Sequence, residues 1–294
     1  MSVNLLRLKL TLPNAHFRVI HSNDPRKTYP VPPYSTVIGF LANILGNREH
    51  IETMIAGDLA LGVLSKFSCV VREYTWMRNL LANEHKKRYG SVYNRKWQGV
   101  VEHIGGQSPV NIETLNDVEI VIYVYHSNPA VLAVLQENIV CPERWFSHLH
   151  LGRAEDWAMV DSIAEINLLV SANPADFRNA DQYYQWMPEP TAAFGLGEQV
   201  KEETYRELYH KTQGPIMLVT TAYSRVRIPY EGEQGGIVRN FQHVPARLCC
   251  AAVPFLSDFT LPALLVDPEL GAPIYMARVL SNNGSGKEVS CYEE

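Results

Sequence analysis

The apolar residues of the first 170 positions switch repeatedly between two spacings, and this alternation constrains the fold more than any other feature of the sequence. In LLRLKL, residues 5–10, leucines alternate with cations, which is typical of a half-buried strand. Residues 59–71 and 118–125 also have strand character, and the second run is apolar enough for the centre of a sheet. Residues 158–170 are expected to return to that sheet.

Two stretches between these strands have helical spacing. The shorter is PAVLAVLQENI, residues 129–139. The longer follows Pro32 and Pro33, which suit a helix entry because a missing N–H costs nothing there. It ends at Gly46, in the position after a helix where glycine is favoured. Gly39 inside this helix costs about 1 kcal/mol against alanine, so we expect another backbone to pack close to it.

The order strand, helix, strand, strand, helix, strand is that of a ferredoxin-like unit of the RNA-recognition-motif (RRM) type. We therefore predict an α+β fold with an RRM-like domain over residues 1–170. A basic insertion at about residues 75–112 separates its second and third strands. A smaller, irregular β-rich domain is expected over residues 171–280, with a strand at 216–228. Residues 281–294 are expected to form a flexible tail.

Composition excludes several classes of protein. No apolar run approaches the roughly 20 residues that a membrane helix needs, and the alternating charges near the start argue against a secretory signal peptide. The five cysteines contain no CxxC pair, which favours a cytoplasmic protein with most cysteines buried. The net charge of −5 argues against a free-standing nucleic-acid binder, unless basic residues are concentrated locally.

Such a concentration occurs in residues 72–103, where seven cations stand against three glutamates. The cations are Arg72, Arg78, Lys86, Lys87, Arg88, Arg95 and Lys96, and the interleaved aromatic residues are Tyr74, Trp76, Tyr89, Tyr93 and Trp97. Cations neutralise phosphates, and aromatic faces stack on unpaired bases. The pattern predicts a projecting hairpin that contacts nucleic acid. The alternative is a solvated charged loop whose aromatic residues hold its base.

The segment before the first helix, RKTYPVPPY, places two cations and an aromatic residue in the loop after the first strand. We predict that Arg26, Lys27 and Tyr29 lie beside the basic insertion and face an RNA. For Tyr29, the alternative is an apolar contact that holds the start of the helix. Arg153, directly after Gly152, is placed to meet a phosphate.

No motif for a metal, a cofactor or a catalytic nucleophile is present, and we predict no cofactor and no metal. His148 and His150 could ligate a metal only with a third ligand from elsewhere, so two histidines with ordinary hydrogen bonds are the favoured interpretation. Metal-free cleavage of RNA needs only a positioned base. His85 or His103 could supply one, so a ribonuclease remains open.

Three motifs carry a resemblance to a known family: LLRLKLTL, HFRVIHSNDPRKTYPVPPYSTVIGFLANILG and FSHLHLGRAEDW, with the basic insertion before the last. In this order and spacing they resemble CRISPR-associated protein family five, the RAMP subunits of type I Cascade complexes. Length and spacing are most similar to the type I-B form. The resemblance implies an RRM-type fold and a non-catalytic subunit that grips the 5′ handle of the crRNA. It also implies capping of the backbone-subunit filament and docking of the large subunit for crRNA-guided targeting of DNA.

The family has a thumb-like hairpin that lies over the RNA, and residues 75–112 match its position. The resemblance therefore assigns RNA contact to Lys86, Lys87, Arg88, Arg95, Lys96 and Trp97 in the thumb, and to Arg26, Lys27 and Arg153 at the handle.

Two rivals to this interpretation stay open. One is a metal-independent endoribonuclease that processes repeat RNA, as one branch of the family does. Its Tyr/Lys/His constellation has no residue-by-residue match here. The other is a protein-docking module whose basic stretch faces an acidic partner.

Overall fold

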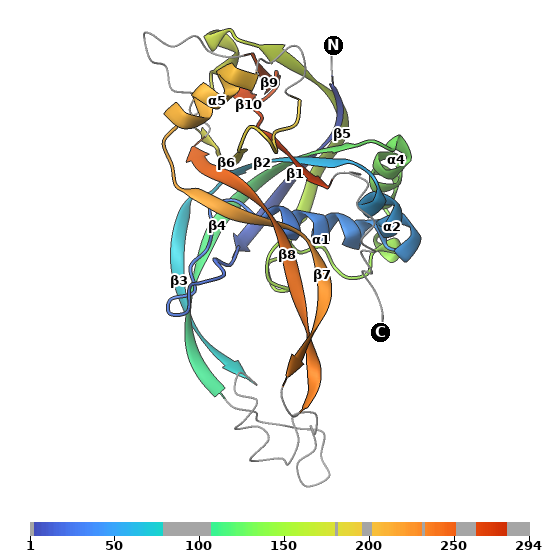
Figure 1. The fold of residues 1–294 in the computed structure, drawn as a ribbon, viewed down its shortest axis with the longest axis vertical. Coiled ribbons are helices and arrows are strands. Elements are labelled where there is room, and N and C mark those ends of the chain that lie inside the picture. The colour runs from blue at the N-terminus through green and yellow to red at the C-terminus, as the bar shows by residue number, and fades with distance from the viewer. Residues whose placement is uncertain are drawn as a thin grey trace.

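The computed structural model describes residues 3–78, 107–179, 182–195, 202–230, 233–250 and 263–280. Within these ranges, eleven strands form one twisted sheet (Figure 1). Four antiparallel strands form its centre, in the order β5 (Met159–Ser171), β1 (Val3–Ala15), β4 (Gln107–His126) and β2 (Leu59–Lys66). The mixed, sheet-rich α+β class predicted from the sequence is confirmed.

Strand β4 is much longer than the sequence indicated, and two strands share it. β2 pairs with its second half up to Lys66, opposite Glu119. After a short break, β3 (Cys69–Arg78) pairs with its first half, beginning with Cys69 opposite Asn116. The single strand predicted over residues 59–71 is therefore wrong. β4 pairs with both β2 and β3 and so sets the register of each. The continuous apolar run over residues 59–71 does not reveal this division.

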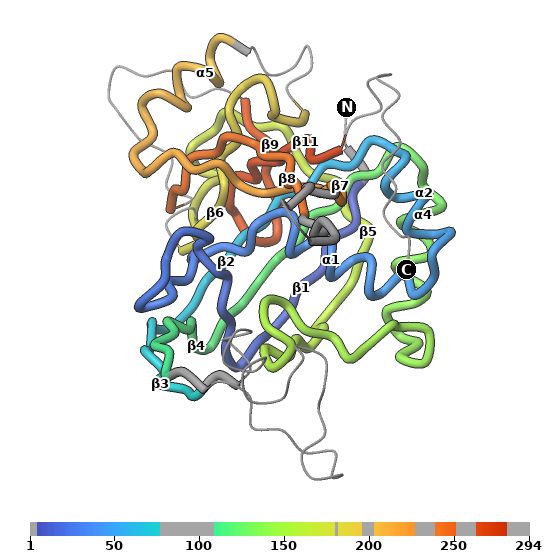
Figure 2. The backbone as a smooth tube through the Cα atoms, turned by 60° about the horizontal axis from the view of Figure 1, so that its bottom comes forward, coloured from blue at the N-terminus to red at the C-terminus, as the bar shows by residue number. Residues whose placement is uncertain are grey.

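Helices α1 (Tyr34–Leu45), α2 (Arg48–Ala56) and α4 (Pro129–Asn138) cover one face of this sheet. Figure 2 shows α2 and α4 close together, far from α5 (Glu202–Lys211). The sequence analysis did not predict α2. Its start is capped by the Asn47 side chain, which accepts a hydrogen bond from the backbone N–H of His50. Short 3-10 turns occur at Pro142–Arg144 and Pro174–Phe177.

Gly46 and Gly39 test the two predictions made for glycines of α1. Gly46 adopts the left-handed conformation, with φ 68°, as predicted for the residue after the helix. The expectation of a close backbone at Gly39 is wrong. Gly39 is exposed, and a Cβ atom built there would meet no heavy atom within 4 Å.

The second half of the chain extends the same sheet on both sides. β6 (Tyr184–Pro188) joins β2 to the paired strands β8 (Glu233–Cys250) and β7 (Ile216–Tyr230), while β9 (Leu264–Asp267) and β10 (Ala272–Pro273) continue from β5. β11 (Met276–Leu280) pairs with β2. β7 confirms the strand predicted at residues 216–228. The boundary near residue 170 stays a prediction.

The segment from β9 to β11 packs on the sheet face opposite the helices, where Leu265, Ala272 and Ile274 meet apolar residues of the central strands. Arg7 on β1, expected on a solvated face, is only 7% exposed. Its guanidinium lies 2.8 Å from the Asp267 carboxylate, which also accepts a hydrogen bond from the Tyr123 hydroxyl. The strand is therefore buried on both faces, because a distant segment supplies the cover.

The sequence analysis predicted that most cysteines are buried. Of the cysteines that the structure describes, Cys69 is exposed, Cys141 and Cys250 are half-buried, and Cys249 is buried. The prediction of mostly buried cysteines is therefore wrong for these residues. Burial raises the pKa of the Cys249 thiol to about 12.

Among the described residues, no helix is both long and apolar enough to cross a membrane.

Candidate nucleic-acid interface

β3 and the first half of β4 leave the body of the protein as a two-stranded ribbon (Figure 1). We call residues 69–78 and 107–116 the β3–β4 arm. Its pairing runs from Cys69 opposite Asn116 to Arg78 opposite Gln107. The predicted insertion at residues 75–112 therefore continues a ribbon that begins at residue 69.

Most of the predicted RNA contacts lie beyond the end of this ribbon. Residues 79–106 are outside the described part of the chain, and so is the side chain of Arg78. RNA contact by the following residues stays a prediction: Arg78, Lys86, Lys87, Arg88, Tyr89, Tyr93, Arg95, Lys96 and Trp97.

Alternate side chains of β3 form an exposed aromatic and basic strip on the β3–β4 arm. Val70, Arg72, Tyr74 and Trp76 share one face of the strand, because side chains two residues apart point the same way. Tyr74 and Trp76 are 64% and 59% exposed, and their ring centroids lie 6.4 Å apart in an edge-to-face arrangement. We call these four residues the β3 strip. Exposed aromatic faces beside a cation are suited to stacking on unpaired bases.

The loop with Arg26 and Lys27 runs along the opposite edge of β4. The backbone N–H of Arg26 donates to the carbonyl oxygen of Asn111, and the N–H of Glu113 donates to the carbonyl oxygen of Arg26. Arg26 is half-buried and Lys27 is exposed. The structure therefore places both predicted cations beside the arm, as the sequence analysis expected.

Tyr29 has a packing role at the entry to α1. It is half-buried, and its ring meets that of Trp186 edge-to-face, with centroids 5.4 Å apart. Burial raises the pKa of the Tyr29 hydroxyl. This geometry agrees with the apolar contact considered as the alternative, while RNA contact by Tyr29 stays a prediction.

Arg153 is held by carboxylates. Its guanidinium lies 2.8 Å from Asp156, 3.2 Å from Glu73 on β3 and 3.5 Å from Glu155. Burial disfavours the charged form, but the hydrogen bonds to Asp156 and Glu73 outweigh it, so the pKa of Arg153 is raised. Arg153 thus ties the loop after α4 to β3. Its predicted contact with a phosphate is not tested by this geometry.

Asp156 organises the same loop. It is fully buried and accepts hydrogen bonds from the backbone N–H groups of His16, at 2.9 Å, and Arg153, at 2.8 Å. Gly152 has φ 118°, and a Cβ atom there would lie 2.8 Å from the Asp156 carboxylate. The loop geometry therefore depends on a charge pair and on one residue without a side chain.

His148 and His150 make ordinary hydrogen bonds. His148 Nε2 lies 2.8 Å from the carbonyl oxygen of Ala154, and His150 Nδ1 lies 3.1 Å from that of His148. In the described ranges, no group of three or more histidine, cysteine or carboxylate side chains is arranged to hold a metal. The favoured interpretation of these histidines agrees with this geometry. His85 and His103 lie outside the described residues.

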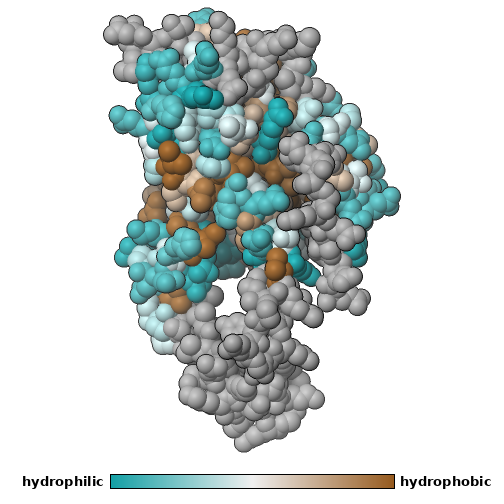
Figure 3. Space-filling model, in the orientation of Figure 1, coloured by the Kyte–Doolittle hydropathy of each residue, from teal (hydrophilic) through white to brown (hydrophobic). Residues whose placement is uncertain are grey.

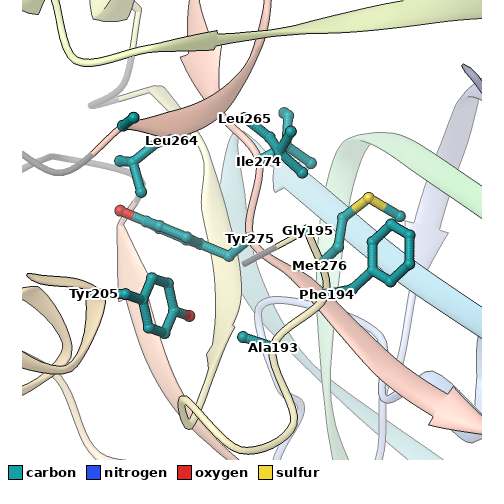
Figure 4. A pocket seen from close by; sticks show the side chains of 10 residues that line it. Ala193, Phe194, Gly195, Tyr205, Leu264, Leu265, Ile274, Tyr275 and Met276 are labelled. Carbon is teal, nitrogen blue, oxygen red and sulfur yellow. The ribbon is translucent and has the colours of Figure 1, made fainter. Parts of the chain in front are cut away.

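Two hollows of the described structure are lined largely by apolar side chains. The cavity in Figure 4, about 20 Å³, is lined by apolar groups and by Tyr205 and Tyr275. Burial raises the pKa of both hydroxyls well above the usual range, and the Tyr205 hydroxyl donates to the carbonyl oxygen of Pro188. A cavity of this size holds about one water. A larger hollow of about 160 Å³ lies among Tyr125, Phe194 and Arg278.

Sequence reasoning missed a second ribbon, formed by the outer parts of β7 and β8. Residues 216–228 were predicted only as a strand. The available signal was the alternation of Tyr223, Arg225 and Arg227 in a stretch without any carboxylate.

The fold and the candidate interface together define a sheet-rich α+β protein with an exposed aromatic and basic arm. Residues 5–101 match the family model described as CRISPR-associated protein (Cas_Cas5). The resemblance to this family, first indicated by the sequence motifs, is therefore confirmed over that segment. The matched segment includes most of β1 and all of α1, β2 and β3. No match is found among curated proteins.

Two solved structures are similar to this chain at low sequence identity. One is a chain of a CRISPR RNA-guided surveillance complex, 12% identical, with a TM-score of 0.47; 90% of this chain and 92% of that chain are covered. Another is a CRISPR protein from Archaeoglobus fulgidus, also 12% identical, with a TM-score of 0.39; 94% of this chain and 99% of that chain are covered.

Proposed function

We propose that this chain is an RNA-binding subunit of a type I CRISPR Cascade complex and that it holds the 5′ handle of the crRNA. The observation that carries the proposal is the family match over residues 5–101. This matched segment contains the loop with Arg26 and Lys27 and the whole β3 strip, so family and exposed chemistry coincide.

The physical basis of binding is phosphate contact combined with stacking. Single-stranded RNA exposes unpaired bases, which proteins usually recognise by stacking on aromatic side chains. Tyr74 and Trp76 would supply the aromatic faces, and Arg72, Arg26 and Lys27 the positive charge. This mode of binding requires no metal, no cofactor and no catalytic group.

Within the complex, the chain would cap the filament of backbone subunits and dock the large subunit, so that the crRNA guides the complex to DNA. The strand order β5-β1-β4-β2 supports a ferredoxin-like, RRM-type core with the insertion at 75–112 as its thumb. We assign the chain to the type I-B form, with domains over residues 1–170 and 171–280. The role would be non-catalytic and cytoplasmic.

Removal of the two aromatic rings from the β3 strip tests this proposal. Each stacked base is worth about 1–3 kcal/mol, so replacing Tyr74 and Trp76 together with alanine should weaken binding of labelled repeat RNA at least roughly tenfold. The measurement is fluorescence anisotropy with the full chain in EDTA.

The matched control keeps an aromatic face at both positions. The Tyr74→Phe, Trp76→Phe variant should bind RNA nearly as well as the unaltered chain. If the alanine and phenylalanine variants bind equally well, the β3 strip does not stack on RNA and the proposed site is wrong.

A further inference from the structure

The β7–β8 pair forms a second projecting ribbon. β8 pairs with β6 only through Ala246–Cys250, opposite Tyr184–Pro188. Within the described residues, 223–230 and 233–241 pair only with each other. We call these two segments the β7–β8 arm. Figure 1 shows that it leaves the body on the same side as the β3–β4 arm, and Figure 3 shows an opening between the two.

The base of the β7–β8 arm has a defined position on the body. Where the register shifts between Thr220 and Tyr223, the Thr220 hydroxyl lies 2.6 Å from that of Ser35 in the first turn of α1. Val219 and Val244 beneath the arm belong to the main apolar core. The arm is therefore attached to the helical layer.

Four side chains share one face of this arm. Tyr223 lies opposite Phe241, and Arg225 lies opposite Arg239, in successive cross-strand pairs. Since side chains alternate along a strand, both pairs point to the same side. The two rings lie 5.4 Å apart, and the Arg239 guanidinium lies 4.8 Å from the centre of the Tyr223 ring. Both arginines are exposed and both rings are half-buried.

The charge of the two strands favours an anionic partner. β7 contains Arg225 and Arg227 and no carboxylate, and β8 contains Arg239 and Arg247 against Glu233 alone. Sites that bind single strands combine positive charge with aromatic side chains on which bases stack, and arginine adds cation–π contacts.

We propose that this face of the β7–β8 arm binds single-stranded RNA, with Arg225 and Arg239 on successive phosphates and Tyr223 and Phe241 against a base. Because both arms leave the body on the same side, one RNA strand could contact both. This inference rests on the proposed function for the identity of the RNA, but it concerns a separate surface from the second half of the chain.

The test compares the salt dependence of RNA binding. Each phosphate contact to a single strand contributes about 0.7 to the slope of log affinity against log salt, so the R225A/R239A variant should show a slope smaller by about 1.4. The probe is labelled single-stranded repeat RNA, with the full chain in EDTA. Affinity at low salt should fall as well.

Two variants control this experiment. R48A/R144A removes the same charge from two exposed arginines on the helical side and should leave the slope unchanged. R225K/R239K keeps the charge on the arm and should restore most of the slope. Thermal unfolding of each variant establishes that it is folded.

The inference is overturned if R225A/R239A has the same affinity and slope as R48A/R144A. If binding is then still lost in the Tyr74→Ala, Trp76→Ala variant, the proposed function stands without the second arm. If R225A/R239A binds RNA normally but loses a protein subunit, the face docks an acidic protein, which also overturns the inference. If the unaltered chain binds no RNA, the proposed function itself fails.

Discussion

Gly39 lies within α1 and Gly46 directly after its end. Only one of these two positions requires glycine. A Cβ atom at Gly46 would lie 1.7 Å from the carbonyl oxygen of Arg144, and its φ of 68° is unfavourable for other residues. Gly39 is exposed, with open space around the position of a Cβ. One glycine is required by geometry, and the other only weakens its helix.

We therefore expect opposite effects from the same substitution. Gly39→Ala should raise the free energy of unfolding by about 0.5–1 kcal/mol, because alanine favours the helix and reduces the freedom of the unfolded chain. Gly46→Ala should lower it by more than about 1 kcal/mol. Urea unfolding of both variants measures the difference, and a destabilising Gly39→Ala would contradict the open space seen here.

At the residue scale, the sequence allows prediction where the cause is local. Gly46 follows the last apolar position of a periodic run, so its role could be predicted. The ion pair between Arg153 and Glu73 could not, because Glu73 lies on β3, 80 positions earlier in the chain. The packing of Tyr29 on Trp186 is equally non-local.

At the scale of elements, the loop after α4 depends on one buried carboxylate. Asp156 is the partner of Arg153 and also accepts two backbone hydrogen bonds. Removing one partner of a buried pair usually costs about 3–5 kcal/mol, because the other charge stays buried. Asp156→Ala should therefore lower the free energy of unfolding by about 3 kcal/mol or more.

Glu155 provides the matched control for Asp156. It also faces Arg153, at 3.5 Å, but its side chain is 67% exposed. Glu155→Ala should cost less than about 1 kcal/mol, as for most exposed pairs. Chemical unfolding distinguishes the two, and equal effects would show that Asp156 does not organise the loop.

Several strands could be predicted from the sequence, but their partners could not. The sequence indicated strands within β1, β4, β5 and β7, and helical spacing indicated α1 and α4. The division of residues 59–71 between β2 and β3 depends on β4, whose first half carries too few apolar residues to be recognised alone. The β3–β4 arm results from that pairing, so its bounds could not be predicted from the composition of the sequence.

At the scale of the whole molecule, charge distribution matters more than net charge. The chain has a net charge of −5, yet cations gather along β3, in the loop beside β4 and on β7 and β8. An assembly subunit needs a basic surface only where it meets RNA. The sequence indicated the first two of these surfaces, but not that the second half of the chain adds an arm on the same side.

The most direct test of the proposed function mixes the full chain with labelled repeat RNA in EDTA, with and without a neighbouring Cascade backbone subunit. Binding and cleavage are followed on the same gel. The account predicts binding without cleavage, strengthened by the partner subunit and weakened by salt. Cleavage at one site would instead indicate a metal-independent ribonuclease, and absence of binding at low salt would contradict an RNA-binding role.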